Sequence, residues 1–350
     1  MPKRPDPLFE IPRPAAFTEP VLDLLGGVAR PRSLSGEEAI AQLARIEAAA
    51  HQGDPEAQAE LARRLLTESP NARSNRRALI LLRKSAAQRS PAGLHLLALL
   101  HLRGQGMKKN PAEGVRLLEE AAYLGSAAAQ TDLAKALALG IGTAKDEGKA
   151  LYWLRLAAAQ GDNASALSAG RMYRDGSGTL QNEREAQKWL EQAARAGIPA
   201  AQFELAELLR RRDISLRDIP GARRWMREAA FSGIVEAQLR IGIASWSGAG
   251  GAVDQREAVR WLCRAAEGGS TKAASMLAGF LMTGNGLPLS LPRAWTLFRW
   301  AAARGDSGAE ATARIIENQI SQTERAEGEK LLRDSSPKAM LETLIPRSDR

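Results

Sequence analysis

One residue spacing organises most of this chain. Counting from position 53 in steps of 36 residues, glycine occupies seven of eight positions, and Arg89 is the exception. Alanine stands three residues before every one of these positions. The glycines are Gly53, Gly125, Gly161, Gly197, Gly233, Gly269 and Gly305. A fixed period of this length, with no insertion, is typical of solenoids, in which each repeat packs only against its neighbours.

Each repeat is predicted to contain two helices, because helix-capping residues recur at two fixed positions. A side-chain oxygen at such a position accepts a hydrogen bond from a free backbone amide of the first turn. First helices are predicted to begin after Asp54, Ser90, Ser126, Asp162, Ile198, Ile234, Ser270 and Asp306, of which six are good caps. Second helices are predicted to begin after Ser74, Asn110, Asp146, Asn182, Asp218, Asp254 and Ser290.

Two further positions describe the packing inside each repeat. One position of the first helix accepts only alanine or glycine, which predicts that the two helices cross closely there; its residues are Ala62, Ala98, Ala134, Gly170, Ala206, Gly242 and Ala278. One position of the second helix holds Leu81, Leu117, Trp153, Trp189, Trp225, Trp261 and Leu297. Four tryptophans in register could stack on sugars or bases. Interlocking of adjacent repeats is the favoured interpretation, because a large side chain opposite alanines fills the space between helices.

A glycine pair separates the two helices in five of the repeats. The pairs are Gly104 and Gly106, Gly140 and Gly142, Gly176 and Gly178, Gly248 and Gly250, and Gly284 and Gly286. They follow helices rather than strands, so left-handed helix C-caps are favoured over a phosphate-binding loop. The first repeat has Glu68 and Pro70 in these places, and the fifth has Arg212 and Ile214.

The combined pattern resembles the Sel1-like repeat, a relative of the tetratricopeptide repeat. The best match is the unit 162–197, with Gly170, Tyr173, Gly176, Gly178, Asn182, Ala186, Trp189, Ala193, Ala194 and Gly197. The resemblance implies an all-α fold, a right-handed α-solenoid of helix-turn-helix repeats whose first helices line the concave side. It also implies an adaptor or scaffold role, as in bacterial signalling, envelope-polysaccharide and host-interaction proteins. The family has no catalytic residues to carry over.

The repeats and their flanks predict five segments: a Pro-rich N-terminal arm (1–35), a capping half-repeat (36–53), seven repeats (54–305), C-terminal capping helices (306–333) and a C-terminal tail (334–350). The arm holds seven of the 17 prolines, which excludes regular helix. Within it, Phe17, Val21, Leu22, Leu24 and Leu25 form an apolar cluster. This cluster is interpreted as a cap on the first helices, with a linear motif for a partner as the alternative.

Prolines and acids interrupt the N-terminal twenty residues, and no run of 18 apolar residues occurs. These features indicate neither a signal peptide nor a membrane span, and predict a cytoplasmic protein or one exported by a signal-peptide-independent route. In the tail, Met340 to Ile345 is the one segment expected to dock.

Nothing in the sequence indicates catalysis. His51, His95 and His101 have no carboxylate or cysteine at metal-ligand spacing, and the single cysteine, Cys263, is interpreted as a small buried apolar residue. Motifs for hydrolases, zinc proteases, P-loops and thiol redox centres are missing from the sequence. The prediction is therefore no enzyme, no cofactor and no metal.

The fifth repeat is the local anomaly, because its loop loses both glycines where arginines accumulate. Residues 198–305 carry +6 of the net charge of +9. The predicted partner-binding residues are Arg210, Arg211, Arg212, Arg217, Arg223 and Arg224. A solvated loop and helix flank is the simpler interpretation of the run. The functional interpretation is a site for an acidic partner, because arginine suits bidentate recognition of carboxylates or phosphates.

The functional prediction is a protein-interaction scaffold that binds a partner peptide or helix, possessing an acidic segment, on its concave face. The alternative is a binder of an anionic polymer, either an acidic exopolysaccharide or, less favoured, a nucleic acid.

Overall fold

The computed structural model of the chain describes residues 36–68, 71–211, 218–249, 252–334 and 336–345. These residues form 18 helices and no strand. They fall into two compact units: the first runs to Ala136 and includes 141–143, and the second contains 137–140 and the chain from Ala144 onward. The predicted all-α solenoid of 36-residue repeats is confirmed.

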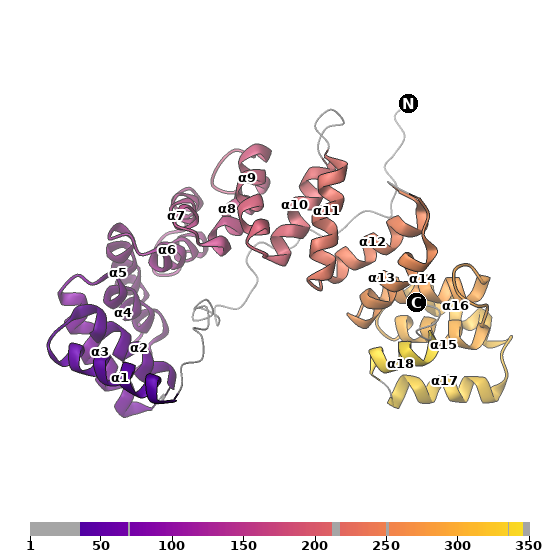
Figure 1. The fold of residues 1–350 in the computed structure, drawn as a ribbon, viewed down its shortest axis with the longest axis horizontal. Helices are drawn as coiled ribbons and strands as arrows, with labels where there is room; N and C mark the ends of the chain where they lie inside the picture. The colour runs from indigo at the N-terminus through magenta and orange to yellow at the C-terminus, as the bar shows by residue number, and fades with distance from the viewer. Residues whose placement is uncertain (1–35, 69–70, 212–217, 250–251, 335, 346–350) are drawn as a thin grey trace. The chain divides into compact units, whose positions relative to one another are not determined.

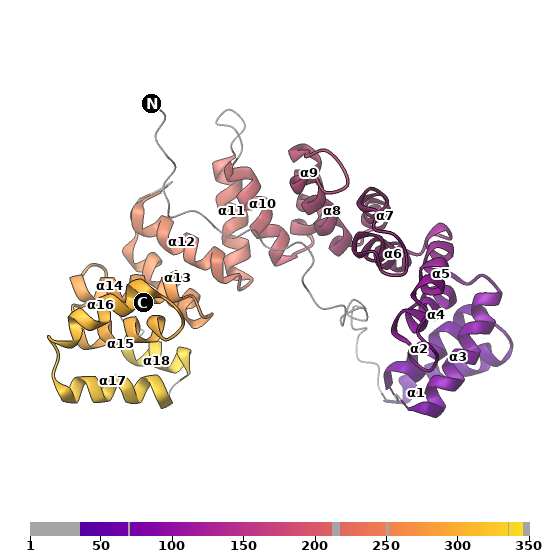
Figure 2. The ribbon, with the colours of Figure 1, turned by 180° about the vertical axis from the view of Figure 1, so that it is seen from behind.

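Each repeat contributes one first helix and one second helix, as Figures 1 and 2 show from opposite sides. The first helices are α2 (Pro55–Glu68), α4 (Pro91–Arg103), α6 (Ala127–Leu139), α8 (Asn163–Asp175), α10 (Pro199–Arg211), α12 (Val235–Ser247) and α14 (Thr271–Thr283). The second helices are α3 (Ala72–Ala87), α5 (Pro111–Tyr123), α7 (Glu147–Ala159), α9 (Glu183–Arg195), α11 (Ile219–Phe231), α13 (Gln255–Glu267) and α15 (Leu291–Ala302). Helix α1 (Gly36–His51) precedes them as the second helix of the leading half-repeat.

The predicted caps hold at nearly all helix starts. The six polar first-helix caps, from Asp54 to Asp306, each accept a backbone hydrogen bond through the side chain. The same is true of Asn110, Asp146, Asn182, Asp218 and Asp254 before the second helices. Ser290 lies at its cap position without a side-chain hydrogen bond to the helix.

In the first repeat the predicted helix cap was wrong by three residues. Helix α3 begins at Ala72, and Asn71 is its cap, accepting a hydrogen bond from the amide of Ser74 at 2.9 Å. Asn71 provides the same acceptor geometry earlier in the chain, so Ser74 is free to become a buried residue of the helix. Helix α2 ends at Glu68, so three residues separate it from α3.

The close helix crossing is confirmed by what an added methyl group would contact. At Gly170 it would lie 2.8 Å from Cγ of Leu190, and at Gly242 it would lie 2.8 Å from Cγ of Leu262. The interlocking role of the tryptophans is also supported. Trp261 is buried in a cluster with Ala229 and Ala230 of the preceding repeat.

A buried glutamine that the sequence analysis did not single out joins successive repeats. Its side-chain amide donates to the carbonyl of the invariant alanine that ends the preceding repeat. The pairs are Gln58 with Ala50, Gln130 with Ala122, Gln202 with Ala194, and Gln238 with Ala230, at 3.0–3.4 Å. Each pair removes an unpaired polar group from the interface between repeats.

The loop glycines have two different roles. Gly104, Gly176, Gly248 and Gly284 are left-handed C-caps, as predicted. The second glycine of the pair packs against the preceding repeat: Gly178 faces the backbone of Glu147 and Gly148 at the start of α7. Gly250, Arg212 and Ile214 lie outside the described residues.

Three helices follow the last repeat: α16 (Ser307–Glu317), α17 (Gln322–Asp334) and α18 (Pro337–Leu344). Helix α17 packs on α15, and α18 packs on α13. Met340, Leu341, Leu344 and Ile345 are buried in the same core cluster as Trp295. The predicted docking of Met340 to Ile345 is confirmed, and α18 forms within the segment predicted as a C-terminal tail.

Candidate functional site

The predicted arginine site begins at the C-terminal end of α10. This helix starts with Pro199, whose missing amide costs nothing at the first position, and ends in Arg210 and Arg211. Cationic side chains are favoured in a last turn because the helix dipole is negative there. Local sequence therefore brings these two arginines together on one helix end.

Both arginines share a single carboxylate, Glu207. Nη2 of Arg210 lies 3.0 Å from Glu207 Oε2, and Nε of Arg211 lies 3.5 Å from the same oxygen. Arg240 of the next repeat binds the other oxygen at 2.5 Å. Three guanidinium groups thus surround one carboxylate, and Arg240 also binds Glu236.

The electrostatics of Glu207 follow from this crowding. Burial pushes the pKa of the carboxyl upward, but the hydrogen bond from Arg210 and the charge of Arg240 outweigh it, so the pKa is lowered. Glu207 is therefore ionised at neutral pH. Its side chain is 12% exposed, whereas those of Arg210 and Arg211 are 46% and 63% exposed.

The remaining predicted residues lie apart from this cluster or outside the described chain. Arg223 and Arg224 are exposed on α11, and Arg224 lies 5.0 Å from the ring centroid of Trp225. Among described residues, no ion pair joins either of them to the α10 cluster. Arg212 and Arg217 lie outside the described residues.

The carboxylates that organise this surface were not among the predicted site residues. One turn before Glu207, Glu204 binds Arg171 at 2.6 Å and Arg174 at 2.8 Å, both from α8. Glu204 and Arg240 occupy the same repeat position, as do Arg171 and Glu207, so opposite charges alternate along the first helices of repeats four to six. Comparing equivalent positions of neighbouring repeats was the signal that could have found this network.

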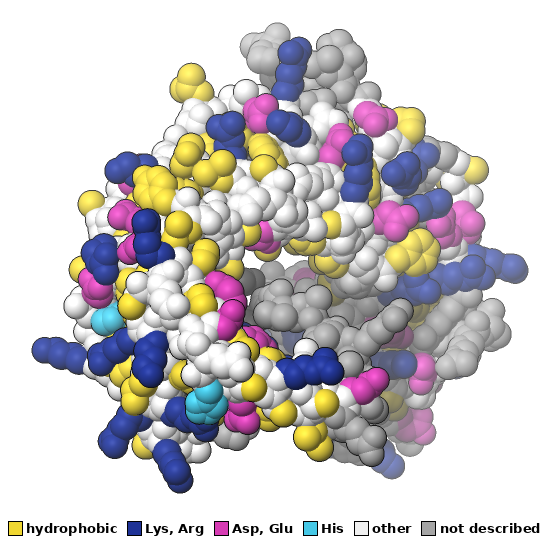
Figure 3. Space-filling view, turned by 60° about the vertical axis from the view of Figure 1, so that its left-hand side comes forward, with side chains coloured by type: hydrophobic (Ala, Val, Ile, Leu, Met, Phe, Trp, Pro, Cys, Tyr) yellow, Lys and Arg dark blue, Asp and Glu magenta, His cyan; other side chains and the backbone are white. Residues whose placement is uncertain are grey.

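The charges of this surface are largely compensated locally. Figure 3, which brings the N-terminal repeats forward, shows basic side chains interspersed with acidic ones on that part of the chain as well. Nearer the N-terminus, Asp132 of α6 binds His95 of α4 at 2.8 Å and Lys135 of its own helix at 3.4 Å. Local ion pairing of this kind lowers the net field that a long anionic polymer would experience.

The described residues contain no cluster of three metal-binding side chains. Cys263 is buried. Within the same residues, no helix is long and apolar enough to cross a membrane.

Comparisons with known proteins match this geometry. The Sel1 repeat profile matches seven consecutive segments, residues 55–90, 91–126, 127–162, 164–198, 199–231, 235–270 and 271–306. The chain belongs to the Sel1 repeat family. Members of the Sel1 repeat family generally act as protein-interaction scaffolds and are generally not enzymes. The sequence matches no curated protein at a significant level.

Several solved structures are similar to this chain. A Sel1 repeat protein from Oxalobacter formigenes is 26% identical with a TM-score of 0.54, and the match covers 65% of this chain and 89% of that one. A protective antigen of uropathogenic Escherichia coli with an SLR fold is 20% identical with a TM-score of 0.36, covering 85% and 88%. A putative Sel1 repeat protein from Klebsiella pneumoniae is 21% identical with a TM-score of 0.37, covering 56% and 95%.

Proposed function

We propose that this Sel1 repeat protein is a non-enzymatic scaffold that binds an extended or helical segment of a partner protein on the surface of its first helices. In this proposal, an acidic part of that segment binds at Arg210 and Arg211. The observation that carries the proposal is the unequal exposure of the cluster. The Glu207 side chain is mostly buried, whereas the two arginines that it binds are exposed to solvent. Glu207 fixes the guanidinium groups, and their outward N–H donors remain for a partner carboxylate.

The neighbouring repeats suggest the rest of the partner segment. At the positions equivalent to Glu207 and Arg240, the next first helices carry Ile243 and Met276, which are half-buried apolar residues. Trp246 lies beside them and stacks on Phe280 with ring centroids 4.0 Å apart. A segment with acidic residues followed by apolar ones would match this change in surface chemistry.

The test is the double substitution Arg210→Ala and Arg211→Ala. The partner is first isolated by affinity capture on the wild-type protein and identified by mass spectrometry, and binding is then measured by calorimetry. Removing the two charge-assisted contacts should weaken binding by about tenfold or more. Arg195→Ala is the matched control, because Arg195 is also exposed and also bound to a glutamate four residues earlier, but lies on a second helix.

Two results would contradict the proposal. Equal affinity of the double variant and the wild type would remove the arginines from the site. Tight binding to polyuronate or DNA, with affinity falling steeply as salt rises, would favour the anionic-polymer function instead.

A further inference from the structure

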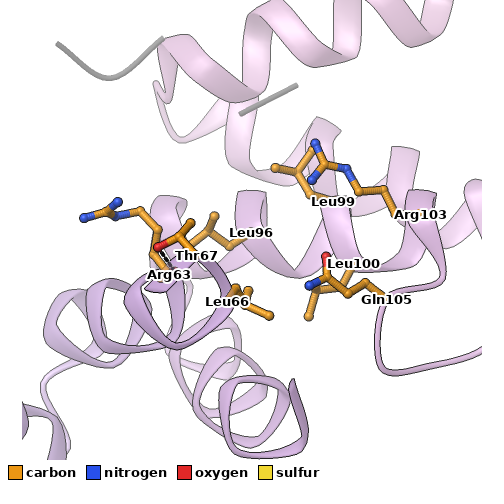
Figure 4. A pocket seen from close by; sticks show the side chains of 8 residues that line it. All are labelled: Arg63, Leu66, Thr67, Leu96, Leu99, Leu100, Arg103 and Gln105. Atoms are coloured by element: carbon orange, nitrogen blue, oxygen red, sulfur yellow. Dashed lines mark hydrogen bonds between the residues drawn. The ribbon is translucent and has the colours of Figure 1, made fainter. Parts of the chain in front are cut away.

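An apolar groove lies on the surface of the first helices in the first two repeats. It is a shallow depression between α2 and α4 that opens to solvent. Figure 4 shows Leu66 of α2 and Leu96, Leu99 and Leu100 of α4 around this space.

The groove is apolar because leucines of α2 and α4 occupy repeat positions that carry ion-paired residues in α8 and α10. Leu96 and Leu99 stand at the repeat positions of Glu204 and Glu207, three repeats earlier. Leu66 stands at the position of Arg174. Where α8 and α10 are joined by ion pairs, α2 and α4 therefore present leucines to each other, and Leu66 and Leu96 remain partly exposed.

The rim of the groove is basic. Arg63 and Arg103 line it together with Thr67 and Gln105. Arg63 is held by Glu60 at 2.7 Å, and Glu60 also binds Arg64, so the local carboxylate is already shared. Arg103 forms no ion pair with another described residue. The groove thus suits an occupant that combines apolar and acidic side chains.

The N-terminal arm contains such a sequence. Between positions 17 and 25, the apolar cluster is interrupted by two acids, Glu19 and Asp23, and no basic residue occurs there. The arm therefore has both the apolar content to fill the groove and the charge opposite to its rim.

The arm joins the described chain at the start of α1, near the groove. Helix α1 packs antiparallel on α2, because Gln58 bonds to Ala50 near one end of the pair and Arg64 bonds to Gln42 toward the other. The start of α1 at Gly36 is consequently near the end of α2, where Leu66 and Thr67 line the groove. The eleven residue steps from Leu25 to Gly36 reach up to about 36 Å, which exceeds the length of about 21 Å of the 14-residue helix α2.

We propose that residues 17–25 of the N-terminal arm occupy the groove between α2 and α4 of the same chain. The arm is then a built-in competitor for ligands on the surface of the first two repeats. This inference does not depend on the arginine site of the fifth repeat.

Weak intrinsic affinity is sufficient for such an intramolecular contact. A short flexible connection gives the segment an effective concentration of about 1 mM, so a dissociation constant of about 0.1 mM for the free segment would keep the groove about 90% filled. A partner would displace the arm by binding the groove about tenfold more tightly.

Hydrogen exchange of the full chain, followed by mass spectrometry, tests the contact. Backbone amides of residues 17–25 should exchange about tenfold more slowly in the wild type than in Leu96→Glu, which places a charge on the half-buried groove wall. Ser168→Glu is the matched control, because Ser168 has the same repeat position two repeats later. This variant should keep the wild-type protection.

A fluorescent peptide of residues 14–28, followed by anisotropy, gives a second readout. It should bind the full-length Leu22→Asp, Leu25→Asp double variant about tenfold more tightly than the wild type, whose groove is already filled. Adding Leu96→Glu to that double variant should abolish binding.

Three results would overturn the inference. One is equal exchange of residues 17–25 in the wild type and Leu96→Glu, and another is peptide binding that Leu96→Glu does not affect. The third is a wild-type dimer in light scattering that Leu96→Glu converts to a monomer, which would make a second copy the occupant. Arg210→Ala with Arg211→Ala should leave the protection of residues 17–25 unchanged, so failure of the partner site and failure of the arm contact are distinguishable.

Discussion

Alanine substitution at Gly178 tests how consecutive repeats are held together. Gly178 has φ +70°, and a methyl group there would overlap the carbonyl of Glu147 and lie 2.7 Å from the amide nitrogen of Gly148. Left-handed backbone costs a non-glycine residue about 1–2 kcal/mol. The methyl group would overlap backbone atoms at the start of α7, which cannot move aside by changing a side-chain rotamer. This overlap adds about 1–3 kcal/mol. The expected loss of unfolding free energy is about 2–5 kcal/mol.

Gly161→Ala separates the two contributions. Gly161 has φ +94°, but no atom lies within 4 Å of the added methyl group. The equivalent position of the first repeat is occupied by Arg89 with φ 58°, so a side chain is accommodated there. Gly161→Ala should therefore lower the unfolding free energy only by the cost of the left-handed backbone, about 1–2 kcal/mol.

Urea denaturation followed by circular dichroism measures both losses. Because a repeat array can unfold in parts, hydrogen exchange of the amides in α7 and α9 is measured beside it. Exchange in these helices should accelerate more in Gly178→Ala than in Gly161→Ala. Equal losses in the two variants would refute the argument, since the close approach of Gly178 to α7 would then contribute nothing.

Two further predictions concern pH. Because the folded-state pKa of Glu207 is lowered, its stabilisation is complete above the unfolded-state pKa of about 4.3 and disappears as pH falls through the folded-state value. In urea denaturation, Glu207→Gln should therefore lower the free energy of unfolding by about 1–3 kcal/mol at neutral pH and leave it unchanged below both pKa values. A loss that does not depend on pH would exclude the ion pairs as its cause. Burial lowers the pKa of His101, so stability should decline as pH falls below about 6.5. His101→Leu should flatten that decline in thermal melts, and an unchanged pH profile would contradict it.

Much of the local structure was predictable because its causes are local. A cap such as Asp254 needs only the amide three residues ahead, which it binds at 2.8 Å. The start of α3 was misplaced because Asn71 and Ser74 are both residue types that cap helices, and the sequence does not show which of the two caps this helix. The buried glutamines could have been found, since Gln202 and Gln238 are one period apart.

The candidate sites were less predictable because their partners come from other repeats. The arginine run indicated Arg210 and Arg211, but it did not identify Glu207, because Arg240 meets it from the next first helix. Sequence also showed apolar residues at Leu66 and Leu96 without indicating that they face each other across a groove.

The sequence by itself determined the repeat, the helix pairs and most helix starts, because these depend on periodic packing and on hydrogen bonds within a few residues. Tertiary structure decided which side chains meet between repeats. It assigned Gly178 a packing role beyond its backbone conformation, and it converted a run of arginines into a cluster with one shared carboxylate. Contacts across about one repeat length are set by the spacing and rotation of neighbouring helices, and the order of residues along the chain does not state these quantities.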